Sequence, residues 1–85
     1  QAGERLTPER RADTARARDR MREEAEIAAA RGDDEARWAA EAMSGDREDL
    51  AASYALDAVG SYAKARHYMA RARAYERRLH EAAPA

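Results

Sequence analysis

Residues 47–82 carry a continuous heptad pattern of small and aromatic side chains, which we call the Ala/Tyr seam. Its members recur at alternating intervals of three and four residues: Ala51, Tyr54, Ala58, Ser61, Ala65, Tyr68, Ala72, Tyr75, Leu79 and Ala82. This spacing is typical of one face of a helix that packs against another helix. The pattern predicts a helix over about 47–82, about 54 Å long at 1.5 Å per residue. The small seam residues would allow a second helix to approach closely.

The first half of the chain has a weaker helical pattern with one interruption. Thr7-Pro8-Glu9 is a helix start, because threonine caps, proline suits the first turn and glutamate meets the positive end of the dipole. Gly32 followed by acidic residues is typical of a helix end and a new cap. We therefore expect helices over about 8–31 and 34–43. One apolar stripe on the first contains Thr14, Ala17, Met21, Ala25, Ala28 and Gly32.

A turn at Ser44-Gly45-Asp46, with Asp46 capping the next helix, divides the chain into two halves. Segments 8–43 and 47–82 are both 36 residues long, so folding at this turn lays them antiparallel and brings Gly32 near 58–60. No run alternates between apolar and polar residues as a strand does. The sequence thus predicts an all-α fold, an antiparallel helical hairpin or three-helix arrangement (about 8–31, 34–43 and 47–82). It would form one small domain over 1–85, with frayed ends at 1–6 and 83–85.

One segment has a local family resemblance. Gly60-Ser61-Tyr62-Ala63-Lys64-Ala65, followed by Tyr68, Met69 and Ala72, resembles the turn and second helix of a tetratricopeptide repeat. The resemblance implies a helix break at Gly60 and a peptide-binding groove. However, Gly32 and Gly60 are 28 residues apart, whereas that family repeats about every 34 residues. The unbroken seam predicts a continuous helix instead, and we assign no family.

The composition predicts a small core that needs a partner. Hydrophobic residues are 45% of the 85, but 24 of them are alanine and only 14 are larger. Such a core stabilises a lone monomer weakly. We therefore expect the chain to complete a helical bundle by self-association or with a partner, as a homo-oligomer or part of a larger helical complex. The first functional hypothesis is a non-catalytic helical protein–protein interaction or oligomerisation module.

Two features of the surface bear on this hypothesis. The predicted partner interface is the seam with Trp38: Tyr54, Ala58, Ala65, Tyr68, Ala72, Tyr75, Leu79 and Trp38. For Trp38, the sequence favours core packing within the hairpin, near Ala52 and Leu56, and an exposed anchor for a partner is the alternative. A second apolar row of Ala52, Leu56, Val59 and Ala63 predicts an additional neighbour for the N-terminal half of the long helix.

Charge is balanced overall but unevenly distributed. The 16 basic and 17 acidic side chains give a net charge of −1, made up of +1 over 1–31, −6 over 32–60 and +4 over 61–85. A hairpin brings the two positive segments together, opposite an acidic turn end. Oppositely charged ends favour an antiparallel dimer or end-to-end stacking.

The alternative hypothesis is a small nucleic-acid-associated accessory protein. Basic and aromatic residues interleave in the C-terminal helix, as in surfaces that contact phosphates and stack on bases. The candidate contacts are Lys64, Arg66, Arg71, Arg73, Arg77 and Arg78. The isoelectric point of about 6.2 favours a protein partner, since dedicated nucleic-acid-binding domains are basic.

Other function classes have little support. The absence of cysteine excludes disulfides, zinc–thiolate sites and a cysteine nucleophile, and no apolar run approaches the roughly 20 residues of a membrane span. Glu76 and His80 share a helix face, but the Glu-x-x-His spacing of di-iron bundles is missing. We expect no enzyme activity, cofactor, metal, small-molecule substrate or membrane partner, and a cytoplasmic location. A composition rich in Ala and Arg is typical of a high-GC bacterium.

Overall fold

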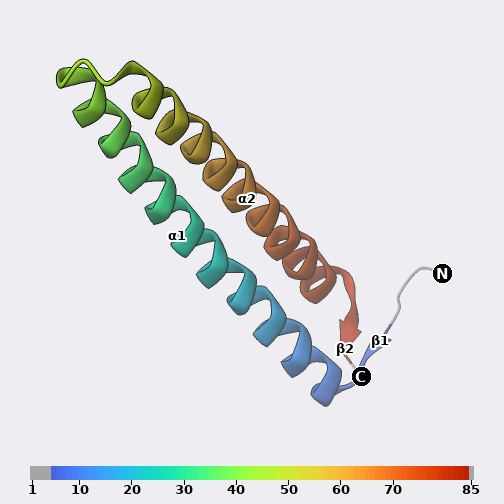
Figure 1. The fold of residues 1–85 in the computed structure, drawn as a ribbon. Helices are drawn as coiled ribbons and strands as arrows, with labels where there is room; N and C mark the ends of the chain where they lie inside the picture. The colour runs from blue at the N-terminus through green and yellow to red at the C-terminus, as the bar shows by residue number, and fades with distance from the viewer. Residues whose placement is uncertain (1–4, 85) are drawn as a thin grey trace.

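A computed structural model describes residues 5–84 as two long antiparallel helices joined by a short turn (Figure 1). Helix α1 spans Pro8–Ser44 and helix α2 spans Glu48–Glu81. Two-residue strands, β1 (Arg5–Leu6) and β2 (Ala83–Pro84), flank them. The molecule is a thin rod with principal extents of 61 × 20 × 12 Å. The predicted helical hairpin and its turn are confirmed.

Helix α1 begins as predicted but does not break at Gly32. The Thr7 Oγ1 accepts a hydrogen bond from the Arg10 N–H at 3.2 Å, and Pro8 occupies the first turn. The helix then continues through Gly32 to Ser44, so the predicted helix end at Arg31 is wrong, and one helix replaces the predicted pair over 8–31 and 34–43. Gly32 has a different role. The Tyr62 ring lies against its backbone, and a Cβ at Gly32 would be 2.7 Å from the ring Cε1.

The turn reverses the chain within three residues. The Gly45 N–H donates to the carbonyls of Glu41 and Ala42, both at 3.2 Å, and closes α1. Asp46 follows with a left-handed φ of 58°, a conformation that aspartate tolerates better than most residues. The N-cap of α2 is Arg47 and has no side-chain cap hydrogen bond, so the predicted cap at Asp46 is wrong.

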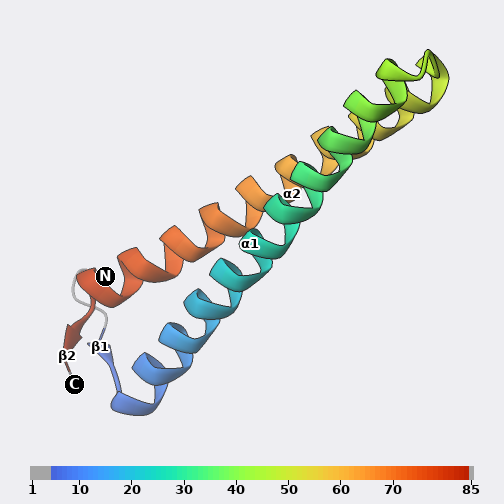
Figure 2. The same ribbon diagram turned by 90° about the vertical axis from the view of Figure 1, so that its left-hand side faces the viewer.

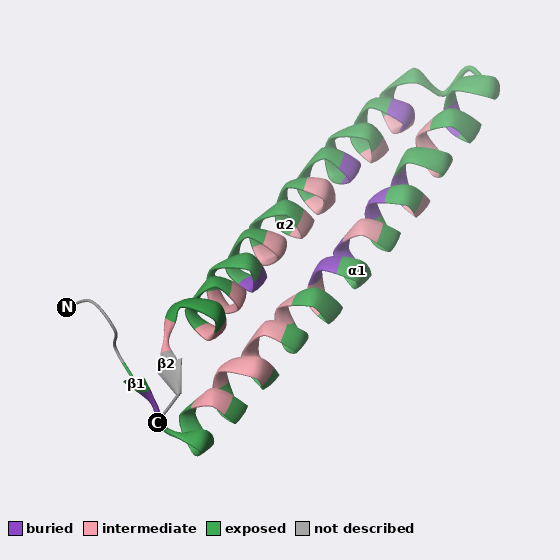
Figure 3. Ribbon diagram, turned by 180° about the vertical axis from the view of Figure 1, so that it is seen from behind, coloured by how far each residue is buried: buried purple, intermediate pink, exposed green. Residues whose placement is uncertain are grey.

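The Ala/Tyr seam faces α1 along the whole of α2. Each of its ten members is buried or half-buried, and Ala51, Ala58 and Ala72 are buried (Figure 3). The predicted stripe of α1 is likewise buried or half-buried, with Ala25 and Ala28 at its centre. Helix α2 passes through Gly60 without interruption, as the seam predicts. The helix break at Gly60 that the tetratricopeptide resemblance implies is absent from α2. The core is therefore a narrow row of alanines between two helices, which run side by side and separate toward the open end in Figure 2.

Polar contacts fix the register in the middle of the hairpin. Glu35 is only 6% exposed, and its carboxylate accepts hydrogen bonds from the Ser61 Oγ at 2.5 Å and the Arg31 Nε at 3.3 Å. Nearby, the Tyr62 hydroxyl donates to Asp33 Oδ1 at 2.5 Å. Gly32 was expected near 58–60 and lies against Tyr62 instead, slightly further along α2.

The open end of the hairpin is closed by main-chain contacts. Strands β1 and β2 pair in parallel, Arg5 with Ala83 and Leu6 with Pro84, and Leu6 is 2% exposed. The Arg11 guanidinium donates to the carbonyls of Leu79 at 3.0 Å and Ala82 at 3.2 Å, which satisfies the C-terminal end of α2. This pairing differs from the expectation of frayed ends at 1–6 and 83–85; residues 1–4 and 85 lie outside the described residues.

The two helical glycines are predicted to respond oppositely to alanine. Apart from the adjoining backbone of α2, no atom lies within 4 Å of a Cβ built at Gly60, so Gly60→Ala should raise the free energy of unfolding by about 0.5–1 kcal/mol through helix propensity. Gly32→Ala should lower it by about 1–3 kcal/mol, because the methyl group collides with the Tyr62 ring. Urea denaturation followed by circular dichroism measures both. Equal stabilisation by the two substitutions would show that Tyr62 moves aside without cost.

Candidate functional site

Four large apolar side chains of the hairpin remain exposed to solvent. Ile27, Met43, Leu56 and Val59 are between 55% and 72% exposed, and the last three lie in the half nearest the turn. The second apolar row predicted from the sequence, Ala52, Leu56, Val59 and Ala63, is exposed throughout. The neighbour expected for this row is therefore not α1.

Beside this row is an open groove between the helices, which we call the turn-half groove. It measures about 330 Å³, and it is lined by Ala39, Ala40, Met43, Glu48, Ala51, Ala52 and Ala55. Leu56 and Val59 extend its α2 side, because residues spaced three and four apart share a helix surface. Glu48 is the one charged residue of the lining.

A second groove, the open-half groove, lies on the same face. It measures about 360 Å³, and it is lined by Ala25, Glu26, Ala29, Ala65, Arg66, Met69 and Arg73. Its residues 25, 26 and 29 are two heptads from 39, 40 and 43, and its residues 65, 66 and 69 are two heptads from 51, 52 and 55. Two heptads of helix correspond to about 21 Å along the hairpin. The same positions thus form both grooves, but arginines border the second.

Tyr62 and Asp33 lie between the two grooves. The hydrogen bond that the Tyr62 hydroxyl donates to Asp33 raises the pKa of Tyr62, with a smaller contribution from desolvation. The tyrosine is therefore neutral over the ordinary pH range, and its ring covers Gly32. We call the two grooves and this central pair the grooved face.

The opposite face is more strongly charged. A smaller groove of about 190 Å³ is lined by Glu24, Ile27, Ala28, Arg31, Ser61, Lys64 and Tyr68. Further toward the turn, the Trp38 and Tyr54 rings pack with centroids 5.6 Å apart, and the Arg31 guanidinium lies 5.4 Å from the centroid of the Trp38 ring. Trp38 therefore packs within the hairpin, against Tyr54.

The predicted interface residues are used inside the chain. The seven seam residues proposed as a partner interface (Tyr54, Ala58, Ala65, Tyr68, Ala72, Tyr75 and Leu79) are buried or half-buried in the hairpin that α2 forms with α1. The seam is therefore occupied by α1. Sequence reasoning missed the grooved face, although Met43 and the second apolar row were the signals for it.

The six basic residues proposed to contact nucleic acid are all exposed on α2. They do not form one surface, because residues seven apart share a side of a helix. Lys64, Arg71 and Arg78 form one stripe beside the groove of the opposite face, whereas Arg66 and Arg73 border the open-half groove. Arg77 belongs to neither stripe.

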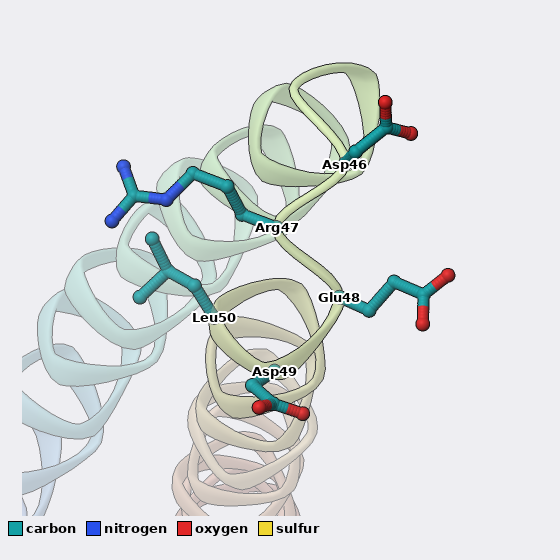
Figure 4. Close-up of a pocket in the computed structure, with 5 residues that line it drawn as sticks. All are labelled: Asp46, Arg47, Glu48, Asp49 and Leu50. Atoms are coloured by element: carbon teal, nitrogen blue, oxygen red, sulfur yellow. The ribbon is translucent and has the colours of Figure 1, made fainter.

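A shallow hollow of about 470 Å³ at the turn is lined by Asp46, Arg47, Glu48, Asp49 and Leu50. Figure 4 shows Asp46 and Glu48 pointing to the side opposite Arg47 and Leu50. These carboxylates do not converge. Within residues 5–84, no group of three or more histidine, aspartate or glutamate side chains is arranged to hold a metal ion.

Glu76 is the centre of an ion-pair cluster in the open half. Its carboxylate lies 2.8 Å from Arg18 Nη1, 3.4 Å from Arg22 Nη2 and 2.7 Å from His80 Nε2. The hydrogen bond from Arg18 lowers the pKa of the Glu76 carboxyl group, and the bond from His80 adds to this effect. Glu76 and His80, the pair weighed as metal ligands, therefore take part in a cluster that joins α1 to α2.

Comparison with known proteins provides no further guide to this site. No family model matches the chain, and no curated protein or solved structure matches it either. Neither α1 nor α2 contains a stretch long and apolar enough to cross a membrane.

The Glu76 cluster predicts an acid-sensitive part of the stability. Because the pKa of Glu76 is lowered in the folded state, its stabilisation is present above the ordinary glutamate pKa of about 4.3 and is lost as the pH falls through the folded value. Glu76→Gln should lower the Tm by a few degrees at pH 7 and by less at pH 3. Thermal melts across this range measure the difference. The control is Glu23→Gln on the exposed side of α1, and an effect of equal size at both pH values would contradict the assignment.

Proposed function

We propose that this chain is a non-catalytic helical protein–protein interaction module that self-associates through its grooved face. The observation that carries the proposal is the exposure of Met43, Leu56 and Val59 around the turn-half groove. Contiguous exposed apolar patches mark interaction surfaces in soluble proteins. A cytoplasmic location and a bacterial source stay predictions from the sequence.

The arrangement of the hairpin supports this role in two ways. The seam, the β1–β2 pair and the Glu35–Ser61 hydrogen bond hold the two helices together, so the grooved face is formed before any partner arrives. A preformed surface loses little conformational entropy on binding. Burying its apolar area contributes about 25 cal/mol per Å², which supplements a core made largely of alanine.

Self-association is tested by sedimentation equilibrium over a wide concentration range. We expect masses above the 9.5 kDa of one chain, and we expect Leu56→Glu to weaken association at least tenfold, because it places a charge beside the turn-half groove. Ala52→Glu and Ala74→Glu form a matched pair, since both residues are exposed on α2 but Ala52 lines the turn-half groove, whereas Ala74 lies on the side of Arg71 and Arg78. Ala74→Glu should leave association unchanged. A wild-type mass of 9.5 kDa at every concentration would contradict the proposal.

The second candidate function, nucleic-acid binding, is supported by the exposure of all six basic residues. Lys64, Arg71 and Arg78 recur every seven residues, which spaces them about 10 Å apart along one side of α2. Contacts from such a stripe to phosphates would release counterions and make binding strongly dependent on salt.

Fluorescence anisotropy with labelled single- and double-stranded DNA and with RNA tests this second candidate. Binding should fall steeply between 50 and 200 mM salt, and replacing Arg71, Arg73, Arg77 and Arg78 together with alanine should abolish it. Replacing Arg10, Arg16, Arg20 and Arg22 of α1 with alanine is the charge-matched control and should have a smaller effect. The absence of binding at low salt would eliminate this candidate.

A further inference from the structure

We infer that the partner of the grooved face is a second copy of this chain, packed antiparallel so that the turn-half groove of each copy covers the open-half groove of the other. The inference rests on the proposed function, which requires only that the face self-associates. It specifies the orientation and the register of the assembly.

The two grooves are related in a way that suits a two-fold axis. Consider a two-fold axis that lies in the grooved face and runs across the two helices. It crosses α1 between residues 34 and 35 and α2 between residues 60 and 61, and it exchanges one groove with the other. On α1 it pairs Met43 with Glu26 and Ala40 with Ala29, and on α2 it pairs Ala52 with Met69, Ala55 with Arg66 and Glu48 with Arg73. The two crossing points lie at one level, because Ser61 and Glu35 are hydrogen bonded there.

Charge distinguishes this orientation from the parallel one. In the antiparallel arrangement the Glu48 carboxylate of each copy lies over the region of Arg73 in the other. The −6 segment of residues 32–60 extends over residues 23–31 and 61–74 of the other copy, which together carry a net charge of +2. In a parallel arrangement the two turn halves lie together, and their carboxylates repel one another. Unfavourable like-charge contacts exclude wrong orientations effectively.

Shape and size also fit a second copy. The axis places the long Met69 side chain against the small Ala52 and the Val59 side chain near Tyr62, so larger residues meet smaller or flat ones across the interface. In this register each copy covers residues 25–44 of α1 and 48–73 of α2 in the other, about 30–39 Å of helix. Over a width of 20 Å this approaches the about 800 Å² per partner of a standard stable interface. Symmetric two-fold pairing is also the commonest form of self-association.

Thiol cross-linking measures the orientation directly, because the chain has no cysteine of its own. Chains with Ala52→Cys are mixed with chains carrying Met69→Cys or Met43→Cys and treated with a short bismaleimide. The antiparallel arrangement predicts that the 52–69 product exceeds the 52–43 product at least fivefold. A parallel arrangement places α1 over α2 and residue 52 over residue 43, so the reverse ratio would overturn the inference.

A charge exchange tests the register independently. Glu48→Arg and Arg73→Glu should each weaken self-association about tenfold, and the double variant should return to within about threefold of wild type. Thermal melts under dissociating dilution control for effects on the hairpin itself. A double variant that associates no better than the single variants would overturn the pairing.

Different results would contradict the proposed self-association and the antiparallel arrangement. A wild-type chain that stays at 9.5 kDa and gives neither cross-linked product contradicts the proposed function as well as this inference. A chain that self-associates but gives mainly the 52–43 product contradicts only the antiparallel arrangement.

Discussion

Close contact between two alanine-lined helices is the constraint on which the rest of this structure depends. An alanine side chain buries little apolar area, so stabilisation by the seam requires the two backbones to approach closely wherever its alanines face the other helix. That approach admits few registers. The ring of Tyr62 needs the bare backbone at Gly32, and the buried carboxylate of Glu35 needs the Ser61 hydroxyl. Displacement along the seam would leave a buried charge without its partners, which is costly.

The same constraint determines what remains outside. A hairpin of two helices covers one stripe on each, and here the stripes are occupied mainly by the smallest apolar residues. Larger residues such as Leu56 and Val59 lie beside the seam, where no third helix covers them. The weakly stabilised monomer predicted from the composition is therefore only part of the physical description. The chain also has exposed apolar surface, and this surface is arranged so that a further helix or hairpin would cover it.

The sequence predicts the parts of the fold that depend on repeated spacing. The heptad of α2 and the turn at 44–46 could be predicted from the sequence, because helix packing and chain reversal impose those residue patterns directly. The break predicted at Gly32 was wrong, because a glycine before acidic residues is typical of a helix end and also fits a position of close approach. Only the contact between Gly32 and Tyr62 distinguishes a position of close approach from a helix end. For the same reason, the heptad could not indicate whether its partner was a second chain or α1, and the grooves required both helices in register.

The separation of charge along the rod explains why orientation and affinity would come from different interactions. Asp46, Glu48 and Asp49 are neighbours in the sequence and lie together at the turn. Folding of one chain therefore does not bring these carboxylates next to the basic residues of the open end. At physiological salt the Debye length is about 8 Å, which is short compared with the 61 Å rod. Attraction between opposite ends therefore acts only once two rods are in contact. Apolar burial in the grooves would then supply the affinity, and the charges would select which end of the partner lies over which.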